Sequence, residues 1–262
     1  MAKFGLIGNP LIHSISPQIH ALFGLENYGL FPLKESELSS FVKDGNMDGF
    51  NVTIPYKEKI IPFLSSVKGA AKAIGAVNTV VKTDDGYVGY NTDADGMIYA
   101  LQKANVFLGG KNVFILGTGG TSKTAEFVAV SLGAKSVKKV GRTAEINYEN
   151  VYSYANEVEI IINATPVGTF PDVNSCPVDV KCFSNLSGVF DCVYNPSETV
   201  LIKEARKKGI PAANGLLMLI EQARKAEELF LEVPRPPALT EQVTEQVAEK
   251  LGSLFNGSFA QR

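Results

Sequence analysis

A glycine-rich loop directly follows a short apolar run near the middle of the chain. The apolar run covers residues 113–116, and the loop, residues 117–120, reads Gly-Thr-Gly-Gly. An apolar strand that ends in glycines and continues into a helix is typical of a dinucleotide-binding turn, because N–H groups at the helix start bind phosphate. The third glycine of the usual pattern is replaced by Ser122, and glycine clusters also mark ordinary turns. The loop therefore predicts strand–turn–helix structure, with phosphate binding as one of two interpretations.

Short apolar runs alternate with helix-like segments along the rest of the chain. Strands are expected at residues 4–7, 49–53, 113–116, 136–140, 159–162, 188–191 and 210–212, with a hairpin of 77–82 and 87–90 around a turn at 84–86. Helices are expected at residues 16–28, from 36, after 93, and at 121–132, 215–231 and 240–254. This alternation predicts an α/β fold with largely parallel sheets.

The pattern also predicts two domains. The helix after Asp93 begins a unit with at least three parallel strands and helical crossovers, which we place at residues 96–231 as a Rossmann-type dinucleotide-binding domain. A proline-rich break at residues 234–237 precedes the last amphipathic helix, which can return to the first unit. We therefore expect the other domain to comprise residues 1–95 and about 232–262.

Charge and cysteine content exclude several classes of protein. A formal net charge of −2 gives no general attraction to nucleic acid or anionic membranes, and no apolar stretch is long enough to span a bilayer. The first residues enter a strand-like run and lack the layout of a signal peptide. Three cysteines without a CxxC pair suggest reduced thiols in a cytoplasmic protein. Two histidines without an HExxH motif make a metal site unexpected.

A lysine and an aspartate end two polar, turn-forming motifs. Lys57 closes the segment Asn-Val-Thr-Ile-Pro-Tyr-Lys at 51–57, and Asp93 closes Gly-Tyr-Asn-Thr-Asp at 89–93. A lysine beside an aspartate can pass a proton to or from an oxygen, and with a dinucleotide site this suggests hydride and proton transfer between a nicotinamide and a small alcohol. Taken singly, Lys57 can be an ordinary solvated lysine and Asp93 the N-cap of the following helix.

Three further polar residues each allow two interpretations. Arg142 follows the second strand of the nucleotide unit, where an NAD enzyme usually carries an acidic residue against the ribose 2′-hydroxyl. Arginine there suits a 2′-phosphate, and the alternative is a solvated loop arginine. Ser14 and Ser16 stand two residues apart, so that both hydroxyls can bind a carboxylate. Ser16 can instead simply cap the helix that continues through Pro17.

Taken together and in this order, the motifs resemble those of the shikimate dehydrogenase family, which includes quinate/shikimate relatives. The resemblance covers nearly the whole chain. The matching motifs lie at residues 8–10, 13–20, 51–57, 74–79, 89–93, 117–120, 141–143, 163–168, 191–196 and 215–222.

This resemblance implies a two-domain enzyme that reduces 3-dehydroshikimate to shikimate with NADPH, in the cleft between a substrate domain and the dinucleotide domain. It implies that Lys57 and Asp93 form the catalytic pair. The implied substrate-binding residues are Ser14, Ser16, Thr53, Asn78, Asp93, Tyr194 and Gln222. The implied NADP-binding residues are Gly117, Thr118, Gly119, Gly120, Thr121, Arg142, Thr143, Thr165, Cys192 and Gly215. The only expected partner is the small-molecule substrate, for a monomer or homodimer in the shikimate pathway of aromatic amino acid biosynthesis.

The chain departs from the family pattern near the expected cofactor. Thr118 and Thr121 replace common alanines, Gly141 replaces an asparagine, and Gly69 stands where an acidic residue is frequent. A second basic residue is also absent from positions 144–146. These departures favour, as an alternative, a quinate/shikimate dehydrogenase with relaxed choice between NAD and NADP. A non-catalytic ligand sensor is the second alternative, against which the intact Lys57 and Asp93 argue.

Overall fold

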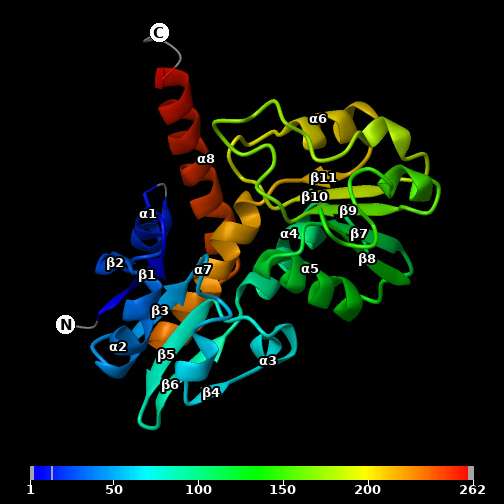
Figure 1. Ribbon diagram of the computed structural model, residues 1–262. Coiled ribbons are helices and arrows are strands. Elements are labelled where there is room, and N and C mark those ends of the chain that lie inside the picture. Colours follow the sequence, from blue (N-terminus) through cyan, green and yellow to red (C-terminus); the bar gives the residue numbers. More distant parts are fainter. Residues whose placement is uncertain (1–2, 13, 259–262) are drawn as a thin grey trace. The chain divides into compact units, whose positions relative to one another are not determined.

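The chain divides into two compact units in the computed structural model, which describes residues 3–12 and 14–258 (Figure 1). The first unit comprises the described residues up to Lys72, together with Val77–Thr92 and the described residues from Ile220 on. The second unit comprises Ala73–Ala76 and Asp93–Leu219. Each unit is built around one β-sheet, and we describe the two separately.

The first unit contains a six-stranded mixed sheet in the order β2-β1-β3-β5-β6-β4. Strands β1, β2 and β3 are parallel, whereas β5 runs antiparallel to both β3 and β6. The strands are β1 (Phe4–Gly8), β2 (Tyr28–Pro32), β3 (Gly49–Val52), β4 (Ser66–Val67), β5 (Thr79–Thr83) and β6 (Gly86–Tyr90). The associated helices are α1 (Ser16–Leu22), α2 (Leu38–Lys43), α3 (Ala70–Ile74), α7 (Leu216–Leu231) and α8 (Ala238–Ser258), with short 3₁₀ turns η1 (Glu35–Glu37) and η2 (Ile61–Phe63).

Apolar side chains cover both faces of this sheet. On one face, the buried ring of Phe50 packs edge-on against Phe41 and Tyr87, with centroids 5.4 and 5.3 Å away. On the other face, Phe4 stacks on Phe230 of α7 at 5.1 Å. A Cβ on Gly49 would lie 2.5 Å from the Phe230 ring, so a glycine at this position lets α7 pack closely against β3.

The second unit contains a five-stranded, fully parallel sheet in the order β11-β10-β9-β7-β8. From β7 the chain goes to β8 on one side and then returns to β9 on the other, so the strand order reverses between β7 and β9. The strands are β7 (Asn112–Leu116), β8 (Ser136–Val140), β9 (Ile160–Asn163), β10 (Gly188–Asp191) and β11 (Ala212–Ala213). The helices are α4 (Asp93–Lys103), α5 (Gly120–Ser131) and α6 (Val200–Lys207), with 3₁₀ turns η3 (Val151–Tyr154) and η4 (Val180–Cys182).

The central strands of the second unit are continuous apolar runs, as expected for parallel strands that are covered on both faces. All residues of β9 and β10 are buried, as are the last four residues of β7. This sheet, with helices between its strands, is a Rossmann-type arrangement. The predicted α/β class is therefore confirmed, and so is the predicted hairpin, which forms β5 and β6.

Two local predictions in the first unit were wrong. The first helix ends at Leu22 instead of residue 28, because Gly24 turns the chain with φ of +96° and residues 28–32 then form the edge strand β2. This strand was not predicted because it contains Gly29 and ends in Pro32, and both residue types are unfavourable in strands. Ser16 does not cap the helix, because it is the first residue of α1 and Ile15 precedes it.

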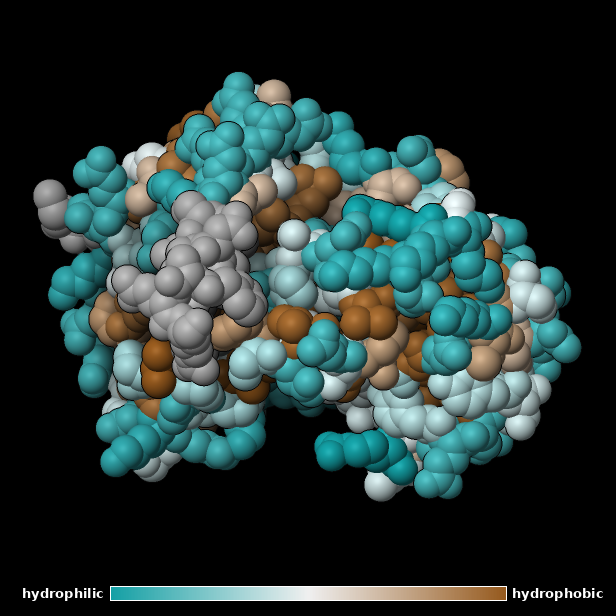
Figure 2. All heavy atoms as spheres, turned by 90° about the horizontal axis from the view of Figure 1, so that it is seen from above, coloured by the Kyte–Doolittle hydropathy of each residue, from teal (hydrophilic) through white to brown (hydrophobic). Residues whose placement is uncertain are grey.

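The surface is predominantly polar on the face drawn in Figure 2, where hydrophobic residues form small separate groups among hydrophilic ones. Within the described residues, no helix is both long and apolar enough to cross a membrane.

Candidate functional site

Several predicted site residues of the first unit lie at one edge of its sheet. In the strand register, Ile7 pairs with Val52, Asn51 with Thr79, and Thr79 with Tyr90. The carboxyl ends of β1, β3 and β6 therefore meet the start of β5 at this edge. The residues that follow these ends or precede β5 are Ser14, Ser16, Thr53, Lys57 and Asn78.

The loop that carries Lys57 is attached to the sheet by backbone hydrogen bonds. Thr53 N–H donates to the Ile7 carbonyl at 2.9 Å, and Val77 N–H donates to the Lys57 carbonyl at 2.7 Å. A Cβ on Gly8 would lie 2.4 Å from Thr53 Cγ2, so the end of β1 needs glycine at this point. Thr53 and Lys57 are both partly buried, which places them where a polar ligand can reach them.

The two serines are adjacent in space. Ser14 Oγ donates to Ser16 Oγ at 3.2 Å, and Ser16 N–H donates to Ser14 Oγ at 3.3 Å. Both residues are half-buried at the start of α1. The two hydroxyls are therefore adjacent, and their use for a carboxylate stays a prediction. His13, of the same motif, lies outside the described residues.

Asn78 lies in a buried network of amides and hydroxyls. Its Oδ1 accepts from Thr92 N–H at 2.7 Å and from Thr79 Oγ1 at 3.0 Å. Its Nδ2 donates to Thr92 Oγ1 at 3.0 Å and to Gln222 Oε1 at 3.3 Å. The structure thus brings together Asn78 and Gln222, which are 144 residues apart in the chain. Because the bond to Gln222 is the longest of these, a ligand hydroxyl can compete for it most easily.

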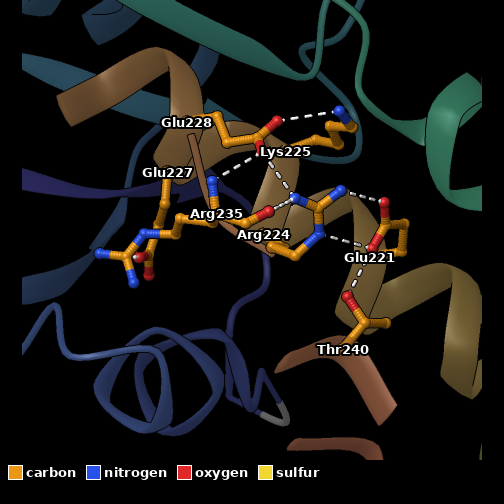
Figure 3. Close-up of polar contacts among 7 residues, drawn as sticks. All are labelled: Glu221, Arg224, Lys225, Glu227, Glu228, Arg235 and Thr240. Atoms are coloured by element: carbon orange, nitrogen blue, oxygen red, sulfur yellow. Dashed lines mark hydrogen bonds and ion pairs between the residues drawn. The ribbon is translucent and has the colours of Figure 1, made fainter. Parts of the chain in front are cut away.

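Gln222 lies on α7, which a cluster of buried charges ties to α8 (Figure 3). Arg224 is 2% exposed and forms ion pairs with Glu221 at 2.5 Å and Glu228 at 2.6 Å. Glu221 also accepts from the hydroxyl of Thr240 on α8 at 2.5 Å. These contacts therefore link α7, the helix that presents Gln222, to the start of α8.

Asp93 and Tyr194 belong to the second unit. Asp93 is buried and is the first residue of α4, where the helix dipole favours a carboxylate. It directly follows Thr92, which bonds to Asn78 in the first unit. Tyr194 is half-buried shortly after β10, and its burial raises the pKa of the phenol above the usual value.

The predicted cofactor residues gather at the carboxyl edge of the parallel sheet. A Cβ on Gly117, after β7, would lie 3.1 Å from both the Ala164 carbonyl oxygen and Thr165 Cγ2, after β9. Gly117 also has φ of +112°, which favours glycine. This close approach occurs at the strand-order reversal, which is where open α/β sheets bind ligands.

Cys192 and Gly215 lie together beyond the neighbouring strands of the same sheet. A Cβ on Gly215 would come within 2.2 Å of the Cys192 carbonyl oxygen, and Gly215 N–H donates to the Val193 carbonyl at 3.1 Å. Only glycine permits this backbone contact, which holds the start of α7 against the end of β10.

The first turn of α5 has room for a ligand. Among the described residues, leaving aside chain neighbours and the helix's own backbone, no heavy atom lies within 4 Å of a Cβ built on Gly119 or Gly120. Thr121 is half-buried at the same turn, while the Ser122 hydroxyl donates to the Gly117 carbonyl at 2.7 Å and is buried. The Ser122 hydroxyl therefore stabilises the glycine loop on its buried side. The N-terminal N–H groups of the helix can still bind a phosphate.

Arg142 and Thr143 are exposed just beyond β8. They follow Gly141, where a Cβ would lie 2.6 Å from Thr118 Cγ2, so the end of β8 touches the glycine loop. Thr118 and Gly141 are two of the positions that depart from the family pattern, and they are in contact with each other. The contact brings the Arg142 segment beside the expected phosphate site.

Two buried networks beneath these edges include residues that sequence reasoning missed. In the first unit, Asn51 accepts from the Tyr28 hydroxyl at 2.7 Å and donates to the Asn78 carbonyl at 3.1 Å. In the second unit, Asn163 accepts from Thr165 Oγ1 at 2.6 Å and donates to Asp191 at 2.9 Å. Asn51 and Asn163 could have been recognised in the sequence by their position, because each is a polar residue at or near the end of a buried apolar strand.

Asp191 is fully buried, and this burial raises its pKa to about 6. Donors from Thr199 Oγ1, Val193 N–H and Asn163 Nδ2, at 2.7, 3.0 and 2.9 Å, oppose that shift. Its carboxyl group therefore links the Thr165 loop to Thr199, which caps α6 by accepting from Ile202 N–H.

No group of three or more His, Cys, Asp or Glu side chains suited to a metal ion occurs within residues 3–12 and 14–258. All three cysteines are among the described residues and are free thiols.

Comparison with known proteins gives consistent results for sequence and structure. The family model of the shikimate dehydrogenase substrate binding domain matches residues 6–80. A protein of Caldanaerobacter subterraneus subsp. tengcongensis named shikimate dehydrogenase (NADP(+)) is 38% identical over 254 residues, covering 87% of this chain and 90% of that protein.

Two crystal structures extend the likeness to the fold. The chorismate mutase/shikimate 5-dehydrogenase fusion protein from Clostridium acetobutylicum matches with a TM-score of 0.91 and 33% identity, covering 97% of this chain and 99% of that chain. Shikimate 5-dehydrogenase from Thermus thermophilus, in complex with NADP(H) and shikimate, matches with a TM-score of 0.82 and 30% identity, covering 94% and 99%.

Proposed function

This chain belongs to the shikimate dehydrogenase family, and from that membership we propose that it catalyses the reversible, NADPH-dependent reduction of 3-dehydroshikimate to shikimate. The observation that carries the proposal is the pair of polar edges, one in each unit. One presents hydroxyl, amide and ammonium groups suited to a polyhydroxylated acid, and the other presents a glycine loop suited to a dinucleotide. Each edge is assembled from residues of the matching family motifs.

The first unit is proposed to bind the substrate. Ser14 and Ser16, with hydroxyls 3.2 Å apart, are proposed to hold its carboxylate. Asn78 and Gln222 are proposed to bind a ring hydroxyl, because a hydroxyl can accept from Asn78 Nδ2 and donate to Gln222 Oε1 in place of their mutual bond. The same role is proposed for Thr53 and for Asp93, and Tyr194 is proposed to border the substrate; Asp93 and Tyr194 are residues of the second unit.

Lys57 and Asp93 are proposed to do the acid–base work. When bound, NADPH supplies a hydride to the substrate carbonyl carbon. The Lys57 ammonium is proposed to stabilise the negative charge that develops on the carbonyl oxygen and to deliver a proton to it. Asp93 is proposed to orient the ammonium group and to contact the hydroxyl that forms.

The glycine loop and its neighbours fit a dinucleotide phosphate, since Gly119 and Gly120 leave open space at the start of α5. We propose that Gly117–Thr121 hold the pyrophosphate. Thr165, Cys192 and Gly215, from the adjacent strand ends, are proposed to border the rest of the cofactor. Arg142 is proposed to pair with the 2′-phosphate, assisted by the hydroxyl of Thr143.

Cellular context is inferred on more general grounds. The free thiols suit a reducing compartment, and we infer a cytoplasmic enzyme of aromatic amino acid biosynthesis. A monomer or homodimer is proposed, and sedimentation velocity distinguishes the two.

A four-way assay tests the function. The protein is incubated with shikimate or quinate, each with NADP⁺ or NAD⁺, and the absorbance of the reduced nicotinamide is followed. We expect the highest kcat/KM for shikimate with NADP⁺. Comparable values with quinate or with NAD⁺ would favour the broader quinate/shikimate dehydrogenase, which the single basic residue at 142–146 motivates. Absence of turnover in all four arms would favour a ligand sensor.

A further inference from the structure

A single buried asparagine holds the turn that follows β9. Asn163 is the last residue of this strand and is 0% exposed. Its Oδ1 accepts from Thr165 N–H at 3.0 Å and from Thr165 Oγ1 at 2.6 Å. Its Nδ2 donates to the Val167 carbonyl at 3.3 Å and to Asp191 Oδ1 at 2.9 Å. Both hydrogens and both lone pairs of the Asn163 amide are therefore used within the protein.

The direction of these hydrogen bonds follows from what each partner can do. The Val167 carbonyl can only accept and the Thr165 N–H can only donate, so Asn163 must turn its Nδ2 toward the first and its Oδ1 toward the second. Asp191 Oδ1, which also accepts from Val193 N–H at 3.0 Å, favours the same orientation. Because Asn163 Oδ1 carries no hydrogen, the Thr165 hydroxyl must donate to it.

The Thr165 hydroxyl can therefore only accept from a ligand. A hydroxyl has one hydrogen and two lone pairs. The hydrogen is donated to Asn163, and one lone pair accepts from Val167 N–H at 3.2 Å. The second lone pair is accessible to a ligand, because Thr165 is only half-buried. A ligand group that binds this hydroxyl must therefore present an N–H or an O–H.

The position of Thr165 indicates which part of a dinucleotide it meets. In the strand order, β9 lies on the opposite side of β7 from β8. The glycine loop after β7 is proposed to hold the pyrophosphate, and Arg142 after β8 is proposed to hold the 2′-phosphate of the adenosine. Since the two halves of a dinucleotide lie on the two sides of the strand-order reversal, the nicotinamide nucleoside belongs on the β9 side. Its carboxamide N–H and its ribose hydroxyls are all donors.

We propose that Asn163 is a positioning residue that fixes the Thr165 hydroxyl as an acceptor for a hydrogen-bond donor of the nicotinamide nucleoside. This donor is the carboxamide N–H or a ribose hydroxyl. The inference deepens the proposed function and rests on it, because it requires NADPH at this edge of the sheet. Asn163 is buried and acts through Thr165, without contact with the cofactor.

Isothermal titration calorimetry with NADPH and with 2′,5′-ADP tests the role of Thr165. The second ligand keeps the adenosine phosphates and lacks the nicotinamide nucleoside. Thr165→Val keeps a methyl group and removes the hydroxyl. We expect its Kd for NADPH to rise about fivefold, the effect of one lost hydrogen bond, and its Kd for 2′,5′-ADP to stay within about twofold of wild type. Thr165→Ser keeps the hydroxyl and should bind both ligands as wild type does.

Thr199→Val is the matched control, because Thr199 donates to the other oxygen of Asp191 at 2.7 Å. This variant loses the N-cap of α6 and should unfold at a lower temperature, with both Kd values unchanged. An unchanged Kd for NADPH in Thr165→Val, or an equal rise for both ligands, would overturn the inference alone. The same loss of NADPH binding in Thr199→Val would also overturn it. Wild-type protein that does not bind NADPH would overturn the proposed function as well.

A double-mutant cycle tests whether Asn163 acts through Thr165. Asn163→Ala removes the acceptor that fixes the hydroxyl, and we expect its Kd for NADPH to rise about three- to fivefold. If Asn163 works through that hydroxyl, Asn163→Ala/Thr165→Val should bind NADPH within about twofold of Thr165→Val alone. A double variant whose Kd rises by the product of the two single effects would refute the positioning role.

Two cofactor analogues test the hydrogen-bond direction and need no change at Asn163, so they remain decisive if Asn163→Ala does not fold. The acetylpyridine analogue of NADPH has a methyl group in place of the carboxamide NH₂ and keeps the carbonyl. The other analogue, 2′-phospho-ADP-ribose, lacks the ring and keeps the ribose. The effect of Thr165→Val should vanish with both analogues if the carboxamide N–H is the donor, and persist with both if a ribose hydroxyl is the donor. An effect that persists only with the acetylpyridine analogue would mean that Thr165 donates to the carbonyl, contrary to the direction that Asn163 imposes.

Discussion

Replacing Gly120 with alanine separates the stability of the protein from its proposed binding of the dinucleotide. Gly120 is the first residue of α5, and a Cβ there meets no described heavy atom within 4 Å beyond its chain neighbours and its own helix. Alanine restricts the unfolded chain more than glycine and suits a helix, so the folded protein should gain about 0.5–1 kcal/mol. For a chain of this length the midpoint of thermal unfolding should rise by about 1–4 °C.

The same methyl group should weaken cofactor binding. If the pyrophosphate lies against the backbone N–H groups of this turn, a Cβ keeps it away and removes one hydrogen bond to a charged group. Such a bond is worth about 1.5–3 kcal/mol, which corresponds to a rise of roughly 10- to 100-fold in the Kd for NADPH. The expected result is therefore a more stable protein that binds its cofactor less well.

Two other glycines of the second unit serve as controls. A Cβ on Gly109 would contact the Leu132 carbonyl oxygen at an ordinary 3.4 Å, so Gly109→Ala should leave NADPH binding unchanged. Gly117→Ala should impair both properties, because φ is +112° and the Cβ would press on Ala164 and Thr165. Thermal unfolding and NADPH fluorescence titration supply the measurements. A Gly120→Ala protein that binds NADPH normally would refute the phosphate-binding role of the loop.

Four further predictions concern both units. Lys57→Ala should lower kcat by roughly 10² to 10⁴ with little change in substrate KM, and a near-normal kcat would remove Lys57 from the chemistry. Arg142→Ala should weaken use of NADPH and spare NADH, whereas equal loss with both would contradict 2′-phosphate binding. Ser14→Ala combined with Ser16→Ala should mainly raise KM for shikimate, and an unaltered KM would argue against carboxylate binding. Because burial raises the pKa of Asp191 to about 6, its stabilising contribution is present below about pH 4 and is lost as pH rises through 6. The difference in unfolding free energy between wild type and Asp191→Asn should thus shrink by about 3 kcal/mol over that range, and a constant difference in denaturant titrations would exclude the shift.

Local signals were sufficient to predict most of the fold. Every predicted strand exists, because buried parallel strands are short apolar runs bounded by turn residues, and the glycines after residue 116 marked the start of α5. The edge strand β2 was missed since an edge strand tolerates Gly29 and Pro32, which local propensity penalises. Its place is set by pairing with β1, and that pairing depends on residues distant in sequence.

The candidate site was predictable only as a set of motifs. The segments holding Asn78 and Gln222 were identified, but their contact spans 144 residues and depends on how α7 packs. Asn51 and Asn163 carried no chemical signal of their own, because an asparagine at or near the end of a strand is usually an ordinary structural residue. Their importance depends on hydrogen bonds that form only in the folded protein.

The β5–β6 hairpin has a practical consequence for engineering. Thr79 and Tyr90 pair at the edge that carries Asn78, whereas Thr83 and Gly86 pair at the far end, where Asp84 and Asp85 are exposed. Peptide tags or reporter modules grafted between these two aspartates would emerge on the opposite side from the polar groups. This tip offers an attachment point for immobilising or labelling the protein without obstructing the polar edge of the first unit.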